Sequence, residues 1–125
     1  MLYRAGRTST YPEEPVEKGI RLHFLGGAGE VGNVGCVIED PTGTKVLMDY
    51  GLAPTKPPKY PSEAPLMDHA VITHSHIDHI GMAPWLVGHH GTTLHGSRLT
   101  SNLSEIMWRA VSYTHLRAHE TCTNL

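Results

Sequence analysis

Three histidines and an aspartate stand close together in the stretch THSHIDH, residues 73–79. Imidazole nitrogens and carboxylate oxygens are ligands that zinc prefers. In extended backbone His74 and His76 project to the same side and can reach one ion, while Asp78 and His79 can reach a second. Two neighbouring ions can share and activate a water that attacks an ester. The pattern therefore predicts a hydrolytic metal centre in which Asp78 also serves catalysis, the alternative being a solvated histidine-rich loop.

The flanking residues predict how this cluster is positioned. The apolar, β-branched run 70–73 is typical of a buried strand, and it ends directly at the first histidine. A helix is predicted from Asp78 onward, and Gly81 and Pro84 keep it short. Upstream, residues 51–65 hold five prolines, which indicates a loop without regular structure.

Other segments predict a mixed α/β domain. Residues 20–25, 33–38 and 44–48 have strand-like patterns, and the turn residues at 40–43 predict a hairpin between the last two. The chain should therefore open with a β meander. One further strand and one further helix are expected at residues 92–95 and 98–109. Strands followed by helices indicate a layered α/β domain.

Composition narrows the class of protein. A chain of 125 residues with 39% hydrophobic residues has room for one domain. The net charge of -2 argues against a general basic field, so any RNA contact must be local. No apolar run approaches a membrane span, and two cysteines are too few for a disulfide framework. We expect a cytoplasmic chain that is not a membrane protein, with residues 1–19 as a flexible leader.

Residues 73–81, THSHIDHIG, resemble the signature of the metallo-β-lactamase superfamily. Residues 24–32, FLGGAGEVG, and 46–51, VLMDYG, look like the opening of its β-CASP ribonucleases, which include ribonuclease J and the nuclease of the cleavage and polyadenylation machinery. Residues 57–61 and 83–86 look most like the archaeal relatives. The resemblance implies an αββα sandwich, of which residues 20–109 would be the N-terminal portion and therefore an incomplete one.

The resemblance also implies ligands and substrate. His74 and His76 would bind one zinc ion, Asp78 and His79 a second, and Asp49 would be an acid beside the cleft rather than a ligand. The full-length parent would cleave RNA phosphodiester bonds. Whether it forms a homodimer is left undecided by the sequence. The remaining ligands and the RNA-gripping domain would lie downstream, so the chain itself is expected to be inactive. Two alternatives remain: a small-molecule hydrolase of glyoxalase or lactamase type, and a non-catalytic binding paralogue.

Several other residues invite a functional interpretation. The glycines of residues 27–32 and Asp49 mimic a dinucleotide-binding fingerprint, but a strand-like segment follows where that motif needs a helix. Glu30 is either a cleft residue or a solvated turn acid, and Cys36 is expected in the core. His23 is expected at the surface. The same is expected of three histidines near the later helices, His89, His90 and His95.

The end of the chain does not resemble this family. Residues 111–121, VSYTHLRAHET, match one reading frame of a transposase-type sequencing adapter throughout. We therefore expect residues 110–125 to be a tail that is not native to the protein, and its histidines are not candidate ligands.

Overall fold

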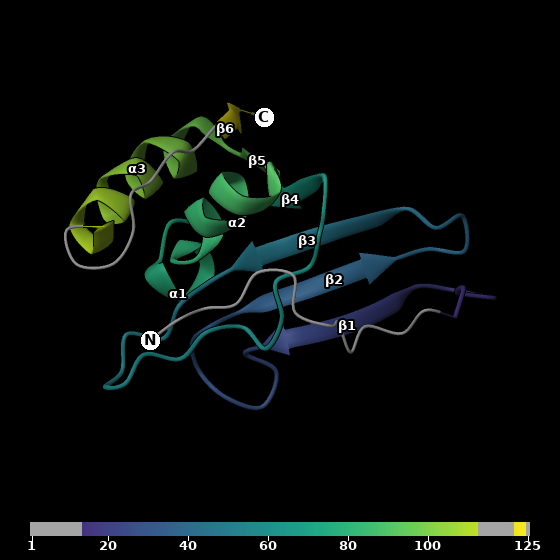
Figure 1. Ribbon diagram of the computed structural model, residues 1–125. Helices are drawn as coiled ribbons and strands as arrows, with labels where there is room; N and C mark the ends of the chain where they lie inside the picture. The colour runs from purple at the N-terminus through teal and green to yellow at the C-terminus, as the bar shows by residue number, and fades with distance from the viewer. Residues whose placement is uncertain (1–13, 113–121, 125) are drawn as a thin grey trace.

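The computed structural model describes residues 14–112 and 122–124, which form one mixed sheet and three helices (Figure 1). The strands follow the order β1-β2-β3-β4-β5-β6 across the sheet. In chain order the elements are β1 (Arg21–Gly26), β2 (Gly35–Glu39), β3 (Lys45–Tyr50), β4 (His69–Val71), α1 (Ile77–Ile80), α2 (Ala83–His90), β5 (Thr93–Gly96), α3 (Arg98–Ser112) and β6 (Cys122–Asn124).

The predicted meander is confirmed. β1, β2 and β3 pair antiparallel, and β4, β5 and β6 continue the sheet in parallel. The β2–β3 turn is closed by the Asp40 carboxylate, which accepts hydrogen bonds from the backbone N–H groups of Thr42 and Thr44 at 2.9 and 3.1 Å. The hydrogen bonds from Thr42 lower the pKa of Asp40. This is the role expected of aspartate in a tight turn.

One row of cross-strand neighbours forms the centre of the core. Val37, Leu47, Ala70 and Leu94 follow one another across β2, β3, β4 and β5, and each is at most 1% exposed. Figure 1 shows α1, α2 and α3 gathered over the β3–β6 half of the sheet, with β1 at the opposite edge. Helix residues such as Leu86 join the same apolar cluster. This face of the sheet is therefore the one that the helices cover.

The neighbouring row points to the other face, which the described residues leave open. Phe24, Cys36, Met48, Val71 and His95 are consecutive partners across β1 to β5, and none of them is buried. Phe24 is 54% exposed. A sheet with helices on one face and apolar side chains on the other is half of a sandwich. This architecture confirms the expected α/β fold, an incomplete αββα arrangement.

The predictions for two residues, His23 and Cys36, were wrong. Leu22 is 53% exposed, whereas His23 lies on the helix-covered side with its side chain 22% exposed. Its Nε2 is 3.3 Å from Oε1 of the buried Glu63. Cys36 is half-buried on the open face instead of in the core. An alternating strand fixes which residues share a face, but the pairing of β1 with β2 decides which face is covered, since His23 pairs with the buried Val37.

The predicted helix after Asp78 divides in two, and the last predicted helix is present. α1 ends at Ile80, and Pro84, four positions on, has no N–H to donate to the Ile80 carbonyl. Gly81 sits against Leu52, where an added Cβ would lie 2.5 Å from the Leu52 Cβ. α2 then carries a proline in its first turn, a position that proline tolerates. The indole Nε1–H of Trp108 donates a 2.8 Å hydrogen bond to the Ile80 carbonyl, which fastens α3 to α1.

Two further segments, the one after the glycines and residues 51–65, agree with the sequence predictions. The segment that follows the glycines continues into β2 and not into a helix, as the argument against dinucleotide binding requires. Residues 51–65 form a loop with one isolated bridge, between Ala53 and Lys59. Within the described part of the chain, no helix has the length and apolar character needed to cross a membrane.

The two expected chain ends stay predictions. Residues 1–13 of the leader and residues 113–121 and 125 of the tail lie outside the described residues. Backbone of the tail that is described extends α3 to Ser112 and forms β6 beside β5. Pairing of this kind does not test where residues 110–125 originate.

Candidate metal centre

The histidine-rich loop joins β4 to α1 and is held by backbone hydrogen bonds to two other segments. The Val34 N–H donates to the Asp78 carbonyl at 2.9 Å, and the Leu52 N–H donates to the Ile77 carbonyl at 3.0 Å. Because these anchors come from the end of the glycine-rich turn and from the loop after β3, two separated parts of the chain fix one short turn.

Gly51 makes this close approach feasible. A Cβ at Gly51 would lie 1.6 Å from the Asp78 carbonyl oxygen, a distance no side chain can occupy. The Gly51 N–H also donates to the Val34 carbonyl at 2.9 Å. The end of β3 is therefore pressed directly against the backbone of the predicted ligand Asp78.

The structure brings the four predicted ligands into one neighbourhood. The ring centroids of His74 and His76 are 4.7 Å apart, and those of His74 and His79 are 3.9 Å apart. Nε2 of His79 is 3.7 Å from Oδ2 of Asp78. Each of the four side chains retains some exposure, so solvent or a substrate has access to the cluster.

Asp49 lies behind this cluster at the end of β3. It is 3% exposed, and its backbone has a φ of 60°, a left-handed conformation that aspartate tolerates better than most residues. Oδ1 accepts the backbone N–H of Thr73 at 2.8 Å. Oδ2 accepts the Thr73 hydroxyl and the Nδ1–H of His79, each at 2.7 Å. One buried carboxylate thus receives two hydrogen bonds from the loop and one from α1.

This network favours one tautomer in each of two imidazoles, those of His79 and His74. A carboxylate only accepts hydrogen bonds, so His79 must carry its proton on Nδ1. The Thr73 hydroxyl donates its hydrogen bond to Asp49. Its oxygen is then the acceptor for Nδ1 of His74, 3.0 Å away. In the neutral form of each ring, Nε2 is then the nitrogen that carries the lone pair. In a metal-binding histidine, one ring nitrogen usually donates its proton to a neighbouring oxygen, and the other nitrogen binds the metal through its lone pair.

The residues present fit a divalent cation through this donor chemistry. Among residues 14–112 and 122–124, however, no group of three or more histidine, cysteine or acidic side chains is arranged to hold an ion. The rings of His74 and His79 are tilted 49° against each other. The ligand assignments for His74, His76, Asp78 and His79, and the supporting role of Asp49, therefore stay predictions.

The other candidate residues from the sequence, among them Glu30, His89 and His95, lie outside the cluster around Asp49. Glu30 is an exposed turn acid: Nδ2 of Asn33 donates to it at 3.0 Å, and this hydrogen bond lowers its pKa. His89 packs its ring against Trp85 with centroids 4.2 Å apart. His95 lies 2.9 Å from His69, between Nε2 and Nδ1, on the open sheet face. None of these histidines is placed in the cluster around Asp49.

Sequence reasoning missed two residues that build the site, Thr73 and Gly51. Thr73 was assigned only to the strand before His74, although a hydroxyl residue directly before a histidine motif is a usable signal. Gly51 carries no signal of its own, since its partner Asp78 is 27 positions away and only the fold brings them together.

Residues 29–105 of the chain match the Metallo-beta-lactamase superfamily. The chain belongs to this superfamily. The matched span runs from the glycine-rich turn through the histidine cluster into α3. Members of this superfamily depend on divalent metal ions, in agreement with the donor chemistry around Asp49.

Several curated proteins are similar in sequence to the chain. Transcription termination factor FttA of Thermococcus kodakarensis is 32% identical over 68% of the chain. Endoribonuclease ysh-1 of Neurospora crassa is 29% identical over 97% of the chain, and ribonuclease J of Corynebacterium glutamicum is 33% identical over 66%. The chain spans only 15%, 15% and 13% of these relatives, respectively. It corresponds to a small part of each of them.

Proposed function

We propose that the chain is the part of a zinc-dependent β-CASP ribonuclease that contributes the His-x-His-x-Asp-His ligands. The arrangement of Asp49, Thr73, His74 and His79 carries the proposal, because it engages Nδ1 of both histidines and leaves their Nε2 atoms as the nitrogens available to a metal. Two of the similar proteins are named as ribonucleases, which favours RNA over a small thioester or amide as the substrate.

Each residue has a separate task in this proposal. His74 and His76 hold one zinc ion, and Asp78 and His79 hold the other. When bound, zinc polarises a phosphodiester and activates water for its hydrolysis. Asp49 keeps the proton of His79 on Nδ1 and, through Thr73, orients His74. Gly51 and Val34 hold the backbone at Asp78.

Zinc titration tests the ligands. Calorimetric titration of zinc chloride into the chain should give saturable binding, and His76→Ala should weaken it about ten-fold or more. His89→Ala is the matched control, because His89 is an exposed histidine that packs on Trp85. Equal loss in both variants, or no loss in His76→Ala, would show that zinc binds outside the cluster.

RNA binding tests the substrate. The anisotropy of a fluorescently labelled single-stranded RNA should rise with the chain only when zinc is present, and His76→Ala should abolish this rise. The described donors do not complete a metal site, so we expect no cleavage of the RNA by the chain itself. RNA affinity that is identical with and without zinc would contradict the proposal. Hydrolysis of a glutathione thioester instead would favour the small-molecule alternative.

A further inference from the structure

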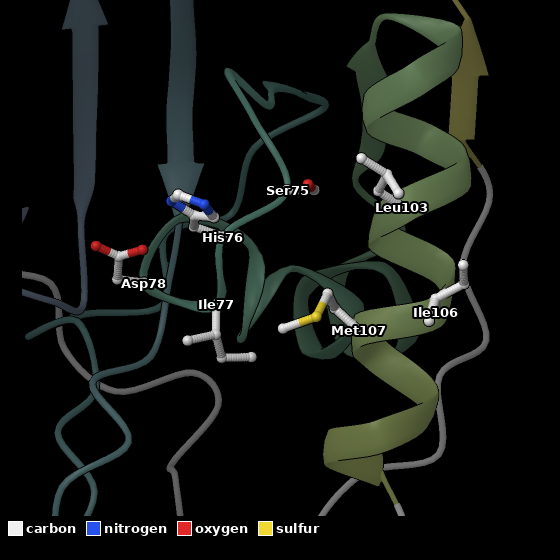
Figure 2. A pocket seen from close by; sticks show the side chains of 7 residues that line it. All are labelled: Ser75, His76, Ile77, Asp78, Leu103, Ile106 and Met107. Carbon is white, nitrogen blue, oxygen red and sulfur yellow. The ribbon is translucent and has the colours of Figure 1, made fainter.

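A pocket of about 350 Å³ lies beside the histidine-rich loop, between residues 75–78 and one face of α3. From α3 it is lined by Leu103, Ile106 and Met107, and its lining surface is almost entirely apolar. Figure 2 shows Met107 reaching from the helix toward Ile77, while the Asp78 carboxylate points away from the helix. The volume falls within the range of about 300–1,000 Å³ that is usual for small-molecule sites.

The α3 side of the pocket exposes apolar side chains to solvent. Leu103 is 42% exposed and Ile106 is 64% exposed, and Leu99, one turn before Leu103 on the same helix, is 68% exposed. Met107 is half-buried against the core and lines the floor between the two elements. A thioether is polarisable and makes favourable contacts with aromatic rings. The pocket therefore suits a flat, uncharged ring.

The pocket borders the candidate metal centre, although the Asp78 carboxylate itself points away from α3. His76 and Asp78 line the pocket and belong to the predicted ligand set. No lysine or arginine is found among the described residues that line it, so the pocket does not provide the charge that a phosphate needs. A phosphodiester held at the ligands would present its next uncharged group, the nucleobase, to the apolar wall formed by α3.

We propose that this pocket is a nucleobase subsite, which binds the heteroaromatic base next to the phosphodiester held at the histidine cluster. This inference rests on the proposed function. The wall offers methyl and thioether contacts instead of a hydrogen-bond pattern, so the subsite accepts any base. It binds purines more tightly than pyrimidines, because affinity grows with the apolar area removed from water.

Methyl NMR of the 125-residue chain tests the subsite directly. With ¹³C-methyl methionine, titration with adenosine 5′-monophosphate should shift the Met107 methyl signal saturably, and uridine 5′-monophosphate should require a higher concentration. Ribose 5-phosphate, which has no base, should leave the signal unchanged. Met48 lies on the open face of the sheet, and its methyl signal serves as an internal control that should not move.

Two leucines of α3 provide matched variants. Leu103→Ala should weaken adenosine 5′-monophosphate binding about ten-fold, the lower end of the effect of removing apolar contact from a pocket. Leu99→Ala should not change it, since Leu99 is on the same helix, is 68% exposed and does not line the pocket. Both residues retain exposure, so both variants should keep the dispersed NMR spectrum of the folded chain.

The outcomes separate this inference from the proposed function. Zinc binding at the histidine cluster without any Met107 response to the nucleotides would overturn the subsite and leave the metal centre standing. A saturable Met107 shift in a chain that binds no zinc would support base binding and overturn the proposed function. Met107 broadening that grows with chain concentration, and not with nucleotide, would overturn the subsite by showing that α3 contacts a second copy.

Discussion

Oδ2 of Asp49 lies 2.7 Å from Nδ1 of His79, although the two residues are 30 positions apart. The same carboxylate binds the hydroxyl and the backbone of Thr73. A single buried acid thus connects the end of β3 to the loop before α1 and to the start of α1 itself. It lies at the position where an acid can control the tautomer of a metal-binding imidazole.

Asp49→Asn should lower zinc affinity by about 10-fold to 100-fold, because an amide cannot accept hydrogen bonds with both of its polar atoms. Calorimetric titration with zinc measures the change. Asp40→Asn, at the exposed β2–β3 turn, removes the same charge away from the cluster and should leave zinc affinity unchanged. An Asp49→Asn variant that binds zinc as tightly as the parent would disprove the supporting role of Asp49.

Gly51→Ala should destabilise the chain by about 3 kcal/mol, since the new methyl group must displace the Asp78 carbonyl. Urea unfolding followed by circular dichroism measures this loss. Gly88→Ala is the counterpart: Gly88 lies in α2 with no atom near its virtual Cβ, and the change should stabilise the helix by about 0.5 kcal/mol. Equal stabilities in the two variants would mean that β3 does not press against the loop.

Leu47→Ala should cost about 2–5 kcal/mol, because Leu47 is fully buried on the helix-covered face. Leu22→Ala on the open face should cost only about 0.5 kcal/mol, as for an ordinary surface position. Urea unfolding of both variants compares the two faces of the sheet. A cost for Leu22→Ala as large as that for Leu47→Ala would show that the open face is covered in solution.

Alkylation of Cys36 should require a higher pH than alkylation of a free cysteine. Partial burial raises the pKa of this thiol, so at any given pH a smaller fraction is the reactive thiolate. Iodoacetamide modification at a series of pH values, read by mass spectrometry of the peptide that contains Cys36, gives the midpoint. Cys122 falls in a different peptide and is read separately. A midpoint at or below the usual value of about 8.5 would contradict the burial.

Short-range sequence patterns were sufficient to predict much of the fold. The strand alternation, the turn at Asp40 and the prolines of residues 51–65 each act through a few neighbouring residues, so the meander and the following loop could be predicted. The spacing of the histidine motif also predicted its place after a strand and at the start of a helix. Even there, the structure has two short helices, α1 and α2, where the sequence predicted one.

The sequence by itself determined the order of the elements and the identity of the candidate ligands, because both are encoded within windows of a few residues. Tertiary structure alone decided which face of β1 is covered, since alternation is symmetric until β1 pairs with β2 and places His23 beside the buried Val37. It also decided the supports of the site. The contacts of Asp49 with His79 and of Gly51 with Asp78 join residues about 30 positions apart, and no local pattern encodes such distances.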